Sequence, residues 1–208
     1  MSRTVDYYFT LASPWAYLGH VAFVGIAQRH SVAINYKPVF VGRVFAETGG
    51  LPLQKRHPVR QRYRMLELQR WRERRGLPLN LKPKYSPFDV THADRVVLAI
   101  LVSKGDPDPF MRAAFHAIWA DERNLGDRTV VAEVAREAGH DPEPLVRLAE
   151  GTITEAAYLL NQENAVAADV FGSPAYTLDG EVFWGQDRLE FLDDALASGR
   201  PPYRAPAG

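Results

Sequence analysis

The feature that most constrains the fold is the placement of the predicted strands, which lie only near the two ends of the chain. Residues 5–10 (VDYYFT) and 32–39 (VAINYKPV) are rich in β-branched and aromatic residues. Residues 59–150 are then mostly helical in pattern, and strands return in residues 175–185 (AYTLDGEVFWG). We therefore expect one α/β core that is interrupted by a long helical segment.

The segments around this interruption give a definite order of elements. Residues 14–30 repeat apolar side chains at helical spacing, and Pro14 falls in the first turn, where its missing N–H costs nothing. Asp179-Gly180 separates two alternating runs, which is the pattern of a type I′ hairpin, and residues 188–197 predict a closing helix. The order β, α, β, helices, β, β, α predicts an α/β protein with a thioredoxin-like fold and an inserted all-helical domain.

The helical block is broken by the proline-rich residues 76–89 (GLPLNLKPKYSPFD). Asp127 and Asp141 each precede an apolar periodic run and predict helix starts, and residues 152–168 predict the last helix of the block. The predicted domains are a discontinuous thioredoxin-like domain of residues 1–40 and 165–200, a helical insertion of residues 41–164, and a C-terminal tail of residues 201–208.

Composition excludes several classes of protein. No apolar run approaches the roughly 20 residues that span a bilayer, and the first residues lack the apolar region of a signal peptide. We therefore expect a cytoplasmic protein without a membrane partner. The chain has no cysteine, which excludes disulfides and thiolate chemistry of its own, and its six histidines are scattered, so we predict no metal site. Any sulfur chemistry must come from a ligand.

The net charge of zero hides a basic segment, Lys55 to Arg75, with nine Lys or Arg against two Glu. A solvated helix is one interpretation, and a positive field that steers an anionic small ligand is the other. Few aromatic residues interleave with the charges, so we expect no nucleic-acid partner. Trp71, Trp119 and Trp184 fall within apolar patterns and are predicted to lie in the core.

Ser13 lies where the first strand passes into the first helix, in the segment TLASPWAYLG. Serine is a preferred N-cap, and that role alone would explain it. The alternative is ligand binding, because free N–H groups and the helix dipole favour negative charge at this position.

Two segments near the C-terminus add to this alternative. Pro174 precedes a predicted strand, where a cis bond would expose the backbone of Ser173 to a ligand and a trans bond would make it an ordinary strand-entry proline. Gln186, Asp187 and Arg188 lie at the entry to the closing helix. They would either cap that helix or hold the ammonium and carboxylate of an amino-acid-like group.

These residues carry a resemblance to a known family. The segments SPWAYLG, KPVFVGRVFAETGGLPLQKR, RYRMLELQRWRERRGLPLNLKPKY and VFGSPAYTLDGEVFWGQDRLEFL occur in order over nearly the whole chain. Together they resemble the 2-hydroxychromene-2-carboxylate isomerase family, relatives of kappa-class glutathione transferases with a DsbA-like thioredoxin fold. The resemblance implies glutathione as cofactor, a carboxylated aromatic small molecule as substrate, and a homodimer.

The resemblance also implies residue roles. Ser13 would lie beside the glutathione sulfur, where redox relatives keep the first cysteine of Cys-x-x-Cys, and would donate a hydrogen bond to the thiolate. The other implied contacts are Ser173 and Pro174 to the cysteinyl part of glutathione, Gln186, Asp187 and Arg188 to its γ-glutamyl end, and Arg43, Lys55, Arg60 and Tyr85 to the carboxylated substrate. Trp15, which directly follows Ser-Pro, would either line the substrate pocket or pack in the core.

The sequence departs from the family pattern at two places. Phe45 stands where the naphthalene-degrading members carry a lysine, with Arg43 the nearest cation. The segment FTLASP also lacks the aspartate of DFxSP. Both departures concern the identity of the substrate more than the glutathione site.

The implied reaction is a glutathione-dependent isomerisation of 2-hydroxychromene-2-carboxylate or a related aromatic enone-pyruvate, by reversible thiolate addition, bond rotation and elimination. Cations such as Arg43 would neutralise the carboxylate and the developing enolate. The alternatives are a kappa-like glutathione transferase that forms conjugates and a non-catalytic thioredoxin-fold binding module. A serine hydrolase is disfavoured, because no G-x-S-x-G motif surrounds Ser13.

Overall fold

The structure is a computed structural model that describes residues 3–206. Its strands are β1 (Thr4–Phe9), β2 (Ala33–Pro38), β3 (Ala175–Leu178) and β4 (Glu181–Trp184). Its helices are α1 (Pro14–Arg29), α2 (Val41–Thr48), α3 (Pro58–Arg75), α4 (Thr91–Val102), α5 (Asp108–Trp119), α6 (Arg128–Glu137), α7 (Pro142–Glu150), α8 (Thr152–Ala167) and α9 (Leu189–Ser198), with short 3₁₀ helices η1 (Leu53–Lys55) and η2 (Gln186–Arg188).

The strands form one mixed sheet in the order β2-β1-β3-β4. β1 and β2 are parallel and are joined through α1, with Tyr7 opposite Tyr36. β3 runs antiparallel to β1, and β4 runs antiparallel to β3. β4 is therefore an edge strand that runs in the same direction as β1 and β2.

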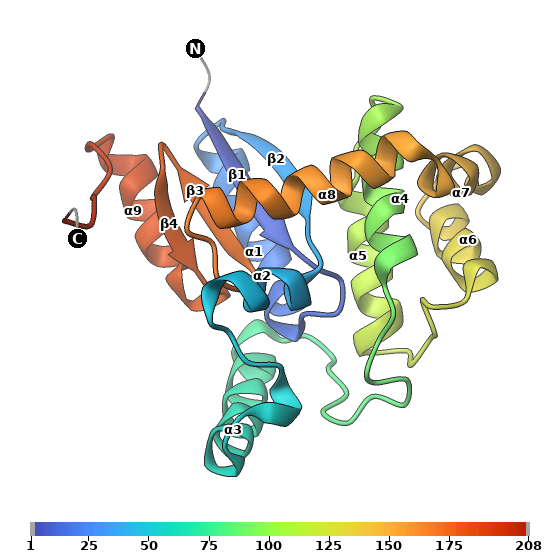
Figure 1. Cartoon of the computed structure of the whole chain (residues 1–208), viewed down its shortest axis with the longest axis horizontal. Helices are drawn as coiled ribbons and strands as arrows, with labels where there is room; N and C mark the ends of the chain where they lie inside the picture. The colour runs from blue at the N-terminus through green and yellow to red at the C-terminus, as the bar shows by residue number, and fades with distance from the viewer. Residues whose placement is uncertain (1–2, 207–208) are drawn as a thin grey trace.

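Helices cover both faces of this sheet (Figure 1). α1 and α9 lie on one face, and α8 crosses the other face with α2 beside it. Helices α4 to α7 form a bundle next to the β2 side of the sheet, and α3 lies below α2 and the sheet in this view. All of the helices from α2 to α8 fall between β2 and β3 in the chain.

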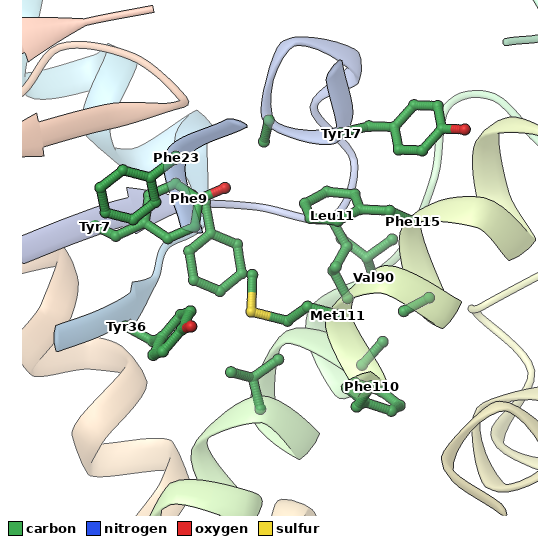
Figure 2. Close-up of a cluster of buried hydrophobic side chains, with 14 of the residues drawn as sticks. Tyr7, Phe9, Leu11, Tyr17, Phe23, Tyr36, Val90, Phe110, Met111 and Phe115 are labelled. Atoms are coloured by element: carbon green, nitrogen blue, oxygen red, sulfur yellow. The ribbon is translucent and has the colours of Figure 1, made fainter. Parts of the chain in front are cut away.

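The main core joins the sheet to the helical bundle. Figure 2 shows the aromatic side chains of β1 and α1 in one cluster with residues of α5, where Met111 extends toward Phe9 and Tyr36. Tyr7, Phe9 and Phe110 are fully buried. Apolar burial of this extent is the main stabilising contribution, and it ties the inserted helices to the sheet.

The local predictions largely hold. Asp179 and Gly180 both have positive φ, as a type I′ turn requires, and Asp127 and Asp141 cap α6 and α7. α2 was not predicted as a helix, because it is short and polar on its exposed face. The prediction for Trp184 is wrong: its side chain is 50% exposed, because it lies on the edge strand opposite the face that buries Phe183.

The division into domains stays a prediction, and residues 1–2 and 207–208 of its ranges lie outside the described residues.

Candidate functional site

The strand directions bring the predicted site segments to one end of the sheet. β1, β2 and β4 all end there, and β3 begins there. Ser13 follows β1, Arg43 follows β2, Pro174 precedes β3, and residues 186–188 follow β4. Segments that are far apart in the sequence therefore meet around the N-terminus of α1 (Figure 1).

Ser13 is the N-cap of α1 and also contacts the segment before β3. Its hydroxyl oxygen accepts a hydrogen bond from the Ala16 N–H at 3.2 Å, and its O–H donates to the carbonyl of Ser173 at 3.0 Å. The Ser173–Pro174 peptide bond is cis. The hydroxyl of Ser13 therefore caps α1 and also links two of the site segments. Its role as an N-cap is compatible with a role in ligand binding.

The loop before Ser13 is fixed by a buried carboxyl group. Asp94 of α4 accepts hydrogen bonds from the Thr10 hydroxyl at 2.9 Å, the Leu11 N–H at 3.0 Å and the Tyr158 hydroxyl at 3.3 Å. Thr10 in turn donates its N–H to the Ser173 hydroxyl at 3.1 Å. Asp94 thus anchors the backbone that carries Ser13.

Burial changes the protonation of this carboxyl group. Asp94 is fully buried, and desolvation raises its pKa to about 7, against the opposing effect of its three hydrogen bonds. Its charge state therefore changes close to neutral pH.

The three residues of η2 differ in the exposure of their side chains. The Gln186 side chain is buried, and its Oε1 accepts two hydrogen bonds from the guanidinium of Arg75, the shorter at 2.8 Å. Its Nε2 is buried without a partner among the described groups. Asp187 and Arg188 are exposed and form an ion pair at 3.1 Å. They are the members of this segment that are open to a ligand.

Two backbone N–H groups next to Ser13 indicate whether the site fits glutathione. The N–H of Trp15, in the first turn of α1, and the N–H of Ser173 have no hydrogen-bond partner among the described groups. A thiolate is favoured where free N–H groups and a helix N-terminus converge. The peptide backbone of glutathione also needs such donors, so the residues present fit the cofactor.

The residues predicted to contact substrate lie on the segments after β2. Arg43 is on α2, Lys55 ends η1, Arg60 is in the first turn of α3, and Tyr85 lies between α3 and α4. All four are exposed, and no described side chain pairs with the charges of Arg43, Lys55 or Arg60. No hydrogen bond joins any of these four residues to Ser13, so their role stays a prediction.

Trp15 was expected either to line the substrate pocket or to pack in the core, and its surroundings have features of both. It packs partly against the main core, and its ring also contacts the guanidinium of Arg64 on α3. The indole therefore faces both the core and the basic helix.

Asp94 and Arg75 were not predicted as site residues. An acidic residue in the first turn of a helix is ordinarily explained by the helix dipole, so Asp94 gave no separate signal. Arg75 is one of many arginines on α3, and only the fold distinguishes the one that reaches Gln186. Within residues 3–206 no group of three His, Asp or Glu is placed to hold a metal ion, and no helix is long and apolar enough to span a membrane.

Comparison with known families agrees with this geometry. A sequence model of the DSBA-like thioredoxin domain matches residues 4–197. The chain therefore belongs to the DSBA-like thioredoxin domain family, and the thioredoxin-like fold predicted from the order of elements is confirmed.

Individual relatives extend over nearly the whole chain. A 2-hydroxychromene-2-carboxylate isomerase of Sphingobium xenophagum is 28% identical over 94% of this chain and 99% of its own. Glutathione S-transferase kappa 2 of Caenorhabditis elegans is 28% identical over 98% of this chain and 95% of its own. A solved 2-hydroxychromene-2-carboxylate isomerase has the same fold, with a TM-score of 0.77 at 24% identity over 94% of this chain and 95% of that one. The resemblance stated from the sequence is confirmed.

Proposed function

We propose that this protein is a glutathione-dependent isomerase of carboxylated aromatic enones, with 2-hydroxychromene-2-carboxylate or a related enone-pyruvate as substrate. The observation that carries the proposal is the Ser13 hydroxyl at the N-terminus of α1, bonded to the Ser173 carbonyl and flanked by two N–H groups that have no partner within residues 3–206. Similarity to isomerases over 94% of the chain supports the same reaction.

The protein supplies position and charge in this proposal. Glutathione, when bound, supplies a thiolate whose reversible addition to the conjugated enone allows bond rotation and returns the thiol unchanged. Ser13 donates a hydrogen bond that stabilises the thiolate, the first turn of α1 adds its dipole, and the Ser173 backbone orients the cysteinyl part. Asp187 and Arg188 hold the γ-glutamyl end, and Arg43 neutralises negative charge on the substrate. A homodimer and a cytoplasmic location stay predictions.

Glutathione binding is the first experiment. The purified protein is titrated with glutathione across pH while thiolate absorbance and binding heat are recorded. We expect binding, with the thiol ionising well below its solution pKa. Absence of binding would reject the cofactor assignment and leave the non-catalytic binding module.

A second experiment separates isomerase from transferase, which the similarity to a kappa-class enzyme makes the other candidate. The carboxylate substrate is supplied in large excess over glutathione, and both are quantified by chromatography. An isomerase converts the substrate while glutathione stays constant. A transferase stops when glutathione is consumed and leaves a conjugate.

A further inference from the structure

Two arginines near the start of α3 have no counter-charge among the described residues. Arg56 and Arg64 are partly buried, and neither has a carboxylate within ion-pair distance among residues 3–206. Burial lowers the pKa of each guanidinium, and a neighbouring arginine lowers it further: Arg56 acts on Arg64, and Arg60 on Arg56. Like charges that are partly removed from water destabilise one another.

Other partly buried arginines that lack an ion pair use their terminal N–H groups within the protein. Arg75 donates to the Gln186 Oε1 at 2.8 Å. Arg95 donates to the Gly151 carbonyl at 2.7 Å. Arg56 and Arg64 differ from these, because their Nη groups make no hydrogen bond or ion pair among residues 3–206.

Aromatic rings hold both guanidinium groups. The Arg64 guanidinium carbon is 5.9 Å from the centroid of the Trp15 ring, and that of Arg56 is 5.8 Å from the Phe45 ring. The Arg56 Nε also donates a hydrogen bond of 2.8 Å to the carbonyl of Leu51. Contacts of this kind restrict the side chains while their terminal N–H donors stay unused.

The contact with Trp15 ties Arg64 to the candidate site. Trp15 is the second residue of α1, two residues after Ser13, and its N–H is one of the two donors near Ser13 that have no partner in the described part of the chain. A half-covered cation at this point interacts more strongly with an anion than the exposed Arg43, whose charge is screened by water.

We propose that Arg64, with Arg56 beside it, is the receptor for the carboxylate of the substrate and determines the preference of the site for anionic aromatic ligands. A carboxylate would fill the planar donors of a guanidinium and remove the repulsion between the two arginines. The inference rests on the proposed function only in that it takes this carboxylate to belong to the substrate.

Ligand binding tests the receptor without turnover. The probes are 2-naphthoate and its uncharged analogue 2-naphthamide, titrated calorimetrically into the glutathione-saturated protein. We expect Arg64→Gln to weaken 2-naphthoate binding at least tenfold and to leave 2-naphthamide binding within twofold. Arg56→Gln should weaken 2-naphthoate less, and Arg64→Lys should restore part of the loss. Arg62→Gln, an exposed neighbour on the same helix, is the matched control and should change neither affinity.

The outcomes separate this inference from the proposed function. Equal affinity of wild type and Arg64→Gln for 2-naphthoate overturns the receptor, even if the enzyme isomerises its substrate. Loss of both probes together also overturns it, because the defect is then not specific for charge. Selective loss of 2-naphthoate in a protein that shows no glutathione-dependent turnover supports the receptor and rejects the isomerase.

Discussion

The hydroxyl of Ser13 donates a hydrogen bond to the carbonyl of Ser173, 160 residues further along the chain, at 3.0 Å. This bond joins the N-terminus of α1 to the segment before β3. It also occupies the donor that a bound thiolate would need. Because a hydroxyl rotates easily, ligand binding requires only that the Ser13 proton turn from the Ser173 carbonyl to the sulfur.

Ser13→Ala is therefore expected to have two separable effects. Loss of the cap lowers the free energy of unfolding by about 1 kcal/mol. Loss of the donor raises the pKa of bound glutathione by about one unit. Asp127→Ala, which removes the cap of α6 away from the site, should cost similar stability and leave the thiol pKa unchanged. Identical thiol titrations in wild type and Ser13→Ala would remove Ser13 from the mechanism.

Asp94→Asn is expected to change how stability depends on pH. The carboxyl has a pKa of about 7 in the folded protein and 3.8 as its ordinary value, so the folded state binds more protons between these limits. The contribution of Asp94 to the free energy of unfolding therefore falls as pH rises from 4 to about 7, by roughly 4 kcal/mol in total.

Urea unfolding of both proteins at pH 5 to 8 measures this effect. The free energy of unfolding of Asp94→Asn, relative to that of wild type, should increase with pH, because asparagine keeps the geometry of the side chain without its charge. Buried His20, whose pKa burial lowers, acts equally in both proteins and cancels in the difference. Parallel stability curves would show that Asp94 does not titrate in this range.

Arg75→Met is expected to loosen the segment that follows β4. It removes both hydrogen bonds to the buried Gln186 Oε1, and an unsatisfied buried acceptor costs about 1–3 kcal/mol. Glutathione affinity should fall as well, because Asp187 and Arg188 directly follow. Arg74→Met is the control: Arg74 is exposed, lies over the Trp71 ring as Arg75 does, and pairs with Glu190 at 3.3 Å. Equal effects of the two variants would contradict a specific role for Arg75.

Two glycines of α1 should respond oppositely to alanine. A Cβ at Gly19 would collide with the Cβ of Gln186 and lie 3.2 Å from the Tyr176 hydroxyl, so Gly19→Ala should destabilise the fold and weaken glutathione binding. A Cβ at Gly25 meets only Arg29, at 3.9 Å, so Gly25→Ala should stabilise the helix by about 0.5–1 kcal/mol. Thermal melts and glutathione titrations of both variants decide this, and stabilisation by Gly19→Ala would be contrary to the packing described.

The fold was predictable where local patterns determine it. Alternating residues, the Asp179-Gly180 turn and the caps at Asp127 and Asp141 act through neighbours in the sequence, so their structures follow from short segments. From the residues alone, the site was predictable as three signals, at Ser13, at Ser173-Pro174 and at residues 186–188. Arg43 was predicted only through the resemblance, and the contacts that join these segments depend on strand direction.

The contacts that were not predictable all join distant parts of the chain. Arg75 reaches Gln186 across 111 residues, and Asp94 reaches Thr10 across 84. Trp184 was misplaced because an apolar strand residue is buried only if something covers its face, and Trp184 lies on the face of β4 opposite to the one that buries Phe183. These contacts and this exposure depend on tertiary packing, and the local periodicity of the sequence does not indicate them.

The turn at Asp179-Gly180 lies at the opposite end of the sheet from Ser13, separated from it by the length of β3, about 13 Å of extended chain. A label, an affinity tag or a surface linker inserted at this turn would stand away from the reacting groups. The hairpin therefore offers an anchoring point for immobilising the protein with its ligand-binding end facing free solution.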